Sequence, residues 1–207
     1  MAMDLYDRYV LPRVVHVACS GRTQMRQRAK VVPCARGRVL EIGIGSGLNL
    51  PFYDAARVSK IWGLDPSPQM RAMAAKVARR VPIDVELVGV SGDQVPLDSA
   101  SVDTVVITYT LCSIPDPEAA VREAARVLRA GGELLFCEHG EAPDQSVRRW
   151  QERLTPIWSR LGGGCHLGRP IPAIIERGGF RLTAVETMYL PGWRFASFNY
   201  WGVATPA

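Results

Sequence analysis

Three glycines that follow an apolar run form the clearest chemical pattern in this sequence. Gly43, Gly45 and Gly47 occupy alternate positions in the stretch VLEIGIGSGLNL. Glycine there costs conformational entropy and offers no side chain for packing, which indicates that a ligand needs the backbone bare. Backbone N–H groups at a strand-to-helix turn can meet a polar ligand. Because Leu48 occupies the sixth position, the pattern is GxGxG and not the dinucleotide pattern GxGxxG.

Acidic residues accompany three successive apolar runs. Glu41 stands two residues before the first glycine, and Asp65 ends the second run. The pair Gly92 and Asp93 closes the third run, where Asp93 can reach an adenine edge. A carboxylate at the position of Asp65 can accept both hydroxyls of a ribose, and strand ends line one crevice in an open α/β sheet. Taken singly, a tight turn and a helix cap before Pro66 explain these residues; together they predict cofactor binding.

Strand-like and helix-like segments alternate along the chain. We expect strands at 38–44, 60–65, 85–90, 102–109, 133–139, 180–190 and 195–205, and helices at 67–80, 117–129, 146–161 and 170–178. This alternation predicts a mostly parallel sheet with helices on both faces, and the short turn before the last segment predicts an antiparallel final strand. Asp116 before Pro117 is typical of a helix start, and Gly131 with Gly132 is expected to end that helix.

Composition limits the class of protein. A chain of 207 residues with 47% hydrophobic residues and a net charge of +5 fits one globular α/β domain, and the charge is attributed to a solvated basic face, with no nucleic-acid partner expected. The five cysteines are scattered without CxxC spacing, so we expect a reducing, cytoplasmic compartment and no metal site. The N-terminus lacks the features of a signal peptide.

The motifs LEIGIGSG, GLDPSPQM, GVSGDQVPL and VLRAGGELLF resemble those of class I S-adenosylmethionine-dependent methyltransferases, over residues 36–140. The resemblance implies a single-domain Rossmann-like sheet of seven strands and S-adenosylmethionine as the cofactor. It assigns the glycines and Glu41 to the methionine part, Asp65 to the ribose and Asp93 to the adenine. A nicotinamide oxidoreductase is the weaker enzyme alternative, because of GxGxG and Glu41. The expected cofactor residues are Glu41, Gly43, Gly45, Gly47, Asn49, Asp65, Pro66, Met70, Gly92, Asp93, Gln94 and Thr108.

A finer resemblance concerns the acceptor. The stretch LCSIPDPEAAVREAARVLRAGGELLFCEHG, together with Trp158 and GCHLGR at 164–169, is similar to small-molecule methyltransferases that include membrane-associated thiol methyltransferases. Phospholipid and quinone methyltransferases share most of this pattern. It implies a small, rather apolar acceptor, with a thiol favoured over a phospholipid amine or a quinone-type carbon. A noncatalytic cofactor-binding subunit is the alternative outside enzymes, which the intact glycines and acids disfavour.

His139 is the candidate catalytic residue. It follows the fifth strand in FCEHG, and its near-neutral pKa suits proton removal from a thiol or an ammonium, although it could simply hydrogen-bond a loop. Glu138 beside it is expected to serve structure. Cys112 lies where cytosine-5 methyltransferases carry a nucleophile after a proline, but Leu111 precedes it, so packing is the favoured role. The expected acceptor-binding residues are Tyr109, Cys112, Trp158 and His166.

Two segments outside the cofactor core, residues 1–35 and the helix at 146–161 within 141–207, are expected to cover the crevice. Proline interrupts each of them, and Pro156 is expected to kink or divide its helix. Basic residues after the first segment could contact anionic lipid, which predicts peripheral membrane contact. The apolar residues at helical spacing are Leu5, Tyr6, Tyr9, Val10, Val14 and Val17, then Val147, Trp150, Leu154, Ile157, Trp158 and Leu161; the basic residues are Arg22, Arg26, Arg28 and Lys30.

Overall fold

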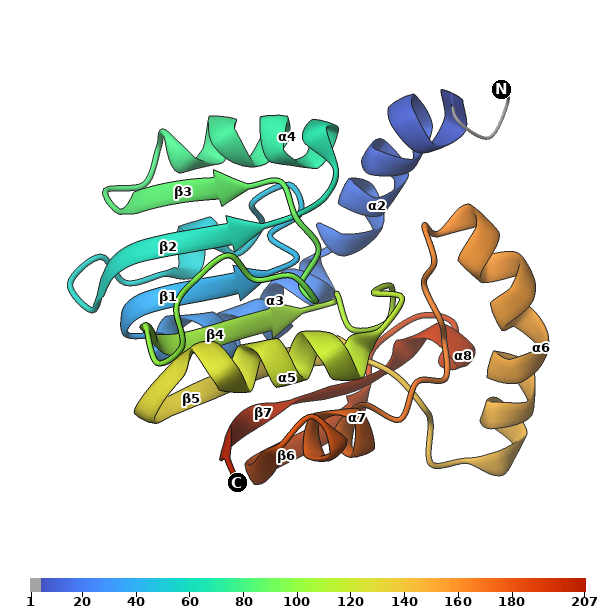
Figure 1. The fold of residues 1–207 in the computed structure, drawn as a ribbon. Helices are drawn as coiled ribbons and strands as arrows, with labels where there is room; N and C mark the ends of the chain where they lie inside the picture. The colour runs from blue at the N-terminus through green and yellow to red at the C-terminus, as the bar shows by residue number, and fades with distance from the viewer. Residues whose placement is uncertain (1–4) are drawn as a thin grey trace.

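The computed structural model describes residues 5–207 and is built around one seven-stranded sheet (Figure 1). The strands lie in the order β3-β2-β1-β4-β5-β7-β6; β1 to β5 pair in parallel, and β7 is antiparallel to both β5 and β6. The predicted fold class is therefore confirmed. The strands are β1 (Gly37–Ile42), β2 (Val58–Leu64), β3 (Asp84–Val88), β4 (Val102–Thr108), β5 (Leu128–His139), β6 (Phe180–Tyr189) and β7 (Phe198–Pro206).

Helices cover both faces of this sheet. One hydrophobic cluster joins Leu40 and Ile42 of β1 to α5 and α7, and a second joins Val39 of the same strand to α3 and the end of α4. Successive side chains of a strand point to opposite faces, so one strand serves both cores. The helices are α2 (Leu11–Cys19), α3 (Arg22–Val31), α4 (Pro68–Ala78), α5 (Pro117–Val127), α6 (Gln145–Leu161), α7 (Ile171–Arg177) and α8 (Arg194–Ser197), with a π-helical turn at Tyr6–Val10 and short 3-10 turns at Val32–Cys34 and Leu50–Phe52.

Three local expectations need correction. The helix α5 is capped as expected, since Asp116 Oδ1 accepts from Ala119 N at 2.8 Å, but it ends at Val127. Gly131 instead lies within β5 at φ +77°, where the register between β4 and β5 shifts, because a bulge uses the freedom of glycine. The helix α6 continues through Pro156, whose exposed position lets water take the freed carbonyl.

Of the segments expected to cover the crevice, α2 and α6 lie beyond the arrowheads of the parallel strands, whereas α3 packs against a face of the sheet (Figure 1). They meet each other, because Tyr6 Oη donates to the carbonyl of Leu161 at 2.7 Å and Leu11 packs beside Gly163. The first four residues of the expected cover lie outside the described residues. No helix in the described part of the chain is both long and apolar enough to traverse a bilayer.

The apolar residues of the N-terminal segment and of α6 do not form buried faces. On the N-terminal segment Val17 is 70% exposed, and on α6 Ile157 is 63% exposed, while Val147 on the same helix is buried. The predicted apolar face of α6 is therefore split, because its packed side is set by Val147 and the buried amide of Gln151. The other exposed apolar side chains of these segments are Leu5, Tyr9, Val10, Val14, Trp150 and Leu161.

Candidate active site

The glycine turn leaves β1 towards the carboxyl end of β2. The N–H groups of Gly43 and Ile44 both donate to the carbonyl of Leu64, at 2.9 Å each. Gly43 has φ +75°, and a Cβ there would lie 2.2 Å from the side chain of Thr110. Gly45 has φ +56°, and a Cβ there would meet Gly43 O at 3.9 Å, an ordinary contact distance. Side chains are thus excluded by contact at Gly43 and by backbone conformation at Gly45, which leaves its surroundings free for a ligand.

Asp65 ties this turn to the end of β2. Its Oδ2 accepts from Gly45 N at 3.1 Å, and its Oδ1 accepts from Ser67 N at 2.8 Å. Ser67 in turn caps α4, where its Oγ accepts from the N–H of the buried Met70. Burial raises the pKa of Asp65, and the two backbone donors oppose this. Pro66 is exposed. The predicted ribose acid therefore lies directly against the predicted glycine turn.

A buried polar network lies behind the turn. Glu41 Oε1 accepts from Asn49 Nδ2 at 2.9 Å, and its Oε2 accepts from Tyr53 Oη at 2.7 Å. Asn49 Nδ2 also reaches Thr108 Oγ1 at 2.9 Å, and Arg28 Nη1 donates to both Asn49 and Thr108. Burial raises the pKa of Glu41 to about 7, although Tyr53 and Arg28 lower it. Glu41 is only 1% exposed, so it acts by holding neighbouring side chains in place.

Arg28 corrects one sequence expectation. The sequence predicts that Arg28 contacts anionic lipid together with its basic neighbours, but its side chain is buried at 5% exposure. Its guanidinium lies 5.0 Å from the ring centre of Tyr109. Its Nε is buried and finds no partner among residues 5–207. Arg22 and Arg26 on the same helix are exposed. Sequence reasoning missed Arg28 because the polar sequence RTQMRQRAK does not reveal which side of the helix is buried.

His16 is a second residue that the sequence did not indicate. Its Nδ1 lies 2.7 Å from Oγ of Ser46, inside the glycine turn. The helix α2 therefore contacts the cofactor loop as well as extending beyond it. No sequence signal links these residues, because they are separated by a helix and a strand.

Asp93 follows β3 with a carboxylate oxygen that lacks a partner. Its Oδ1 is buried, with no hydrogen bond to any of residues 5–207. Gly92 is buried, and a Cβ there would lie 2.3 Å from Ile42 Cγ2 at the end of β1. Gln94 is exposed. Asp93 can thus accept a hydrogen bond from a ligand that lies over the ends of β1 and β3.

The arrangement fits a nucleoside cofactor with an amino-acid end. The buried acceptor of Asp93 suits an adenine amino group, and the partly buried carboxylate of Asp65 suits ribose hydroxyls. The bare backbone at Gly45 and the free Nε–H of Arg28 suit a carboxylate. A buried polar atom without a partner is costly in a protein, so a ligand that satisfies it gains binding energy.

A second group of polar side chains lies past β4 and β5. Cys112 follows β4, His139 ends β5, and Cys165 lies in the loop after α6. His139 Nε2 is 3.2 Å from Cys165 Sγ, and the donor atoms of all three residues lie within 4.8 Å of one another. The sequence predicted His139 and Cys112 at the acceptor side but not their partner Cys165. It also missed the grouping, because its members come from three separate segments.

The backbone around Cys112 is held by a buried carboxylate. Glu138 is fully buried, and its Oε1 accepts from Thr110 N at 2.6 Å and Leu111 N at 3.1 Å. Burial raises the pKa of Glu138 to about 8. The structural role expected for Glu138 is thus the orientation of the loop that carries Cys112. Its Oε2 has no partner within the described chain.

The thiols and the imidazole perturb one another. The neighbouring Cys165 lowers the pKa of Cys112, and His139 adds to this, while burial opposes it. The contact with Cys112 raises the pKa of Cys165. Burial lowers the pKa of His139, but the Cys112 thiolate outweighs it and the net pKa is raised.

The remaining predicted acceptor residues lie around this group. Tyr109 has φ +51° and donates from Oη to Asn199 Oδ1 at 2.9 Å. Trp158 packs edge-on against Phe195, with ring centres 6.0 Å apart. The side chain of His166 is exposed, while its backbone N–H donates to the carbonyl of Cys112 at 2.8 Å. Among these three, only His166 points its side chain to solvent.

The sheet order, the reversed last strand and the glycine turn with its acids define a class I methyltransferase, and the cofactor is S-adenosylmethionine. The methyltransferase domain family matches residues 40–136. Thiol S-methyltransferase TMT1A of Homo sapiens is 30% identical over 177 residues, which cover 83% of this chain and 72% of that protein. The chain therefore belongs to the S-adenosylmethionine-dependent methyltransferase family that contains this enzyme.

Other relatives extend this result. Thiol S-methyltransferase TMT1B of Rattus norvegicus is 34% identical over 152 residues, or 72% of this chain, and the match spans only 62% of the rat protein. Phosphatidylethanolamine N-methyltransferase of Cereibacter sphaeroides is 36% identical over 116 residues, which cover 55% of this chain and 56% of that enzyme. A geranyl diphosphate methyltransferase solved with S-adenosylmethionine superposes with a TM-score of 0.70 at 15% identity, covering 90% of this chain and 86% of that one.

Proposed function

We propose that this methyltransferase methylates the sulfur of a small, rather apolar thiol. One observation carries the proposal: two thiols and an imidazole converge past the ends of β4 and β5, in a chain that is similar to thiol S-methyltransferases. Thiolates and imidazoles can exchange protons near neutral pH, which a thiol acceptor requires. The methyl group of the cofactor is electrophilic because it is bonded to a sulfonium sulfur, which is a good leaving group.

The cofactor residues divide the binding task among them. Asp93 would accept from the adenine, Asp65 would hold the ribose, and the N–H groups of the glycine turn would face the methionine part. Arg28 would bind the methionine carboxylate, with Glu41 holding the surrounding amide and phenol. The remaining predicted cofactor residues would line the same site. Its wall would contain Asn49, Thr108, Met70 and the backbone of Gly92, and its exposed rim would contain Pro66 and Gln94.

The acceptor must lose a proton before it attacks. A thiol with an unperturbed pKa near 8.5 is only a few per cent ionised at neutral pH, so assistance raises the rate. We assign that assistance to His139, whose Nε2 already contacts a sulfur atom. Tyr109, Cys112, Trp158 and His166 would surround the acceptor.

A methyl transfer assay with labelled cofactor tests this function. The purified chain is offered small apolar thiols, amines, phenols and phosphatidylethanolamine vesicles in parallel. We expect the highest kcat/KM with a thiol. The substitution His139→Gln should lower this kcat/KM at neutral pH, and the kcat/KM of the variant should rise again as the pH approaches the pKa of the thiol. Cys34→Ser, which changes an exposed cysteine remote from the site, is the matched control. Methylation of amines, phenols or vesicles without methylation of any thiol would overturn the proposal.

A phospholipid amine is the second candidate acceptor. It is favoured by the Cereibacter sphaeroides relative and by the exposed apolar side chains of α6 and the N-terminal segment. In the same assay, this candidate predicts transfer to vesicles that exceeds transfer to any thiol. Salt-sensitive flotation with anionic vesicles tests the predicted peripheral membrane contact separately.

The division of the single domain into residues 36–140, which bind cofactor, and two flanking parts is also proposed. Residues 1–35 and 141–207 would cover the acceptor, because their tips are joined by the bond between Tyr6 and Leu161. Deleting residues 1–20 should abolish acceptor turnover with a smaller loss of cofactor affinity. His16→Ala is the control that removes only the contact with Ser46. Global unfolding of the deletion variant would show that the segment completes the core instead.

A further inference from the structure

The cluster of Cys112, His139 and Cys165 has the composition of a metal site. It offers two sulfur atoms and one imidazole nitrogen, and these three donor atoms lie within 4.8 Å of one another. Two thiolates and a histidine are ligands that Zn²⁺ prefers, whereas Mg²⁺ and Ca²⁺ take oxygen ligands. The residues come from the ends of two adjacent parallel strands and from the loop that follows α6, at the side where the acceptor must enter.

The surrounding contacts hold these donors in place. The loop with Cys165 is bound to the loop with Cys112 through His166 N and the carbonyl of Cys112, at 2.8 Å. Arg169, from the same loop, donates to the carbonyls of Leu111 and Ile114 on either side of Cys112. The donors therefore need little movement to bind one ion, because the backbone on which two of them lie is already joined.

Two buried atoms beside the cluster lack partners. His139 Nδ1 and Glu138 Oε2 are both buried and unbonded within residues 5–207. A histidine that binds metal through Nε2 usually donates its other N–H to an oxygen. Binding of a cation at Nε2 fixes the proton at Nδ1, so it makes this nitrogen a donor for a carboxylate or a water molecule.

We propose that Cys112 Sγ, His139 Nε2 and Cys165 Sγ bind a Zn²⁺ ion whose fourth position takes the sulfur of the methyl acceptor. Three protein ligands with an open position are typical of catalytic zinc, whereas structural zinc has four. The inference rests on the proposed thiol acceptor. It assigns His139 a different means of assisting thiolate formation, as a metal ligand and not as the base itself.

The chemistry balances without any redox change. A thiol that coordinates Zn²⁺ loses its proton outright, and this proton goes to solvent. The acceptor sulfur then bonds to the methyl carbon while the bond from that carbon to the sulfonium sulfur breaks. The products are a thioether and S-adenosylhomocysteine, and the ion keeps its charge.

Cobalt substitution tests the site without measuring activity. The full chain, reduced and freed of metal, is titrated with Co²⁺, and we expect one equivalent to give sulfur-to-cobalt charge-transfer bands and the visible bands of a tetrahedral ion. Zn²⁺ should displace it. Cys112→Ser, Cys165→Ser and His139→Gln should each weaken metal binding by roughly 100-fold or more, whereas Cys34→Ser should not. Retained cofactor affinity shows that each variant is folded. Absence of these bands, or equal binding by all variants, would overturn the proposal.

The open position is tested by adding a small aromatic thiol to the Co²⁺ protein. We expect a saturable rise in charge-transfer absorption as another sulfur binds. Cys19 is half-buried near the cluster, so Cys19→Ser is measured too. An unchanged spectrum with the thiol, together with loss of a sulfur band in Cys19→Ser, would show a closed structural site and overturn the role in acceptor binding.

The metal site and the proposed function can fail separately. If the ion and the aromatic thiol bind but thiols are not methylated, the proposed acceptor is wrong while the metal site stands. If the metal-free enzyme methylates thiols as fast as the Zn²⁺ form, the function stands and the inference is overturned. Restoration of activity by Zn²⁺ in the wild type, and not in Cys165→Ser, would support both.

Discussion

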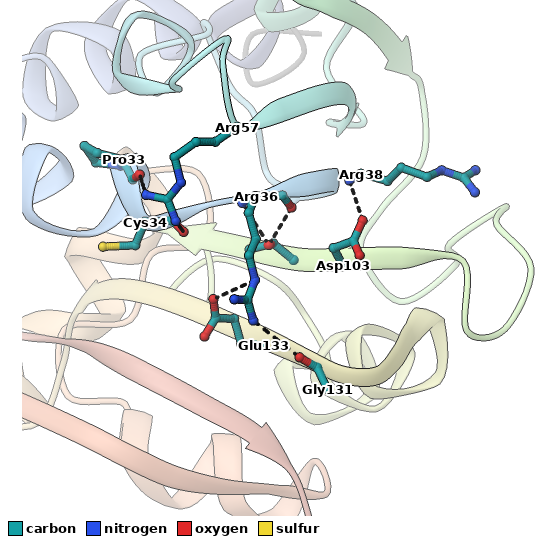
Figure 2. Close-up of polar contacts among 9 residues, drawn as sticks. Pro33, Cys34, Arg36, Arg38, Arg57, Asp103, Gly131 and Glu133 are labelled. Atoms are coloured by element: carbon teal, nitrogen blue, oxygen red, sulfur yellow. Dashed lines mark hydrogen bonds and ion pairs between the residues drawn. The ribbon is translucent and has the colours of Figure 1, made fainter.

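The two ends of the sheet differ in how fully their polar side chains are paired. At the amino end, Figure 2 shows side chains that are paired near the surface: Arg57 donates to the carbonyls of Pro33 and Cys34, at 3.0 and 3.2 Å. Arg36 lies 3.7 Å from Glu133 in an ion pair whose arginine is 54% exposed. Such contacts join segments that are distant in sequence at the surface and contribute little to stability individually.

At the carboxyl end, polar atoms are buried and several have no partner. Among residues 5–207, the unpartnered buried atoms include one each from Arg28, Asp93, Glu138 and His139. All four residues belong to the candidate active site, whereas the remaining such atoms belong to Gln27, Ser101 and Thr205. A polar group buried without a partner reduces stability, so four such atoms from ionisable side chains at the carboxyl end indicate that ligands complete that end, whereas Ser101 and Thr205 each leave only a neutral hydroxyl unpaired at the amino end.

The largest expected effect concerns Glu41. Its pKa is raised from 4.5 to about 7 in the fold, so its contribution to stability is fully present below about pH 4.5 and is lost as the pH rises through about 7. Relative to Glu41→Gln, the wild type should lose about 3 kcal/mol of unfolding free energy over that range. Arg28, Tyr53 and Asp65 face the same carboxyl group and are present in both proteins, so the difference between the two profiles isolates Glu41.

Urea unfolding of both proteins across this pH range measures the difference. Glu152→Gln, at an exposed position of α6, is the matched control and should follow the wild-type profile. Parallel profiles for wild type and Glu41→Gln would show that Glu41 does not titrate in this range, and the contrast between the two ends would be weakened.

Asp65→Ala should lower cofactor affinity by about 1.5 to 3 kcal/mol, because a charge-assisted bond to the ribose is lost. Titration calorimetry with S-adenosylmethionine measures this change. Asp84→Ala removes an exposed carboxylate at the amino end of β3 and should leave the affinity unchanged. A folded Asp65→Ala protein with wild-type affinity would remove Asp65 from the site.

Asp93→Ala should weaken cofactor binding by about 1 to 2 kcal/mol without lowering the stability of the free protein. The reason is that its buried Oδ1 makes no hydrogen bond to the described residues, so nothing there is lost until the cofactor binds. Calorimetry and thermal unfolding of the same samples separate the two quantities, with the exposed Asp98→Ala as control. A large loss of stability together with unchanged affinity would contradict this assignment.

The smallest effect is expected at the amino end. Arg36→Ala should change the unfolding free energy by less than about 1 kcal/mol, because its ion pair is largely solvated. Cofactor affinity should not change. A fall in affinity comparable to that of Asp65→Ala would mean that the two ends are coupled through the sheet.

The sequence by itself determined the fold class, and it indicated where a cofactor site would lie. Alternating strands and helices, a glycine turn after β1 and acids at the ends of β2 and β3 are local patterns, and a parallel sheet brings its strand ends together whatever packs around it. The contact between Gly45 and Asp65 could therefore be expected from their places in successive strands, and the structure has it at 3.1 Å.

Only the tertiary structure decided which charged and sulfur-containing residues complete the site. Arg28 is buried and Arg26 exposed because α3 packs one side against the sheet, and composition gives no direction of packing. Cys112, His139 and Cys165 meet because three loops are joined by hydrogen bonds between residues up to 58 positions apart. Spacing along the chain cannot reveal such a group, since its geometry depends on how separate segments fold back over the same strand ends.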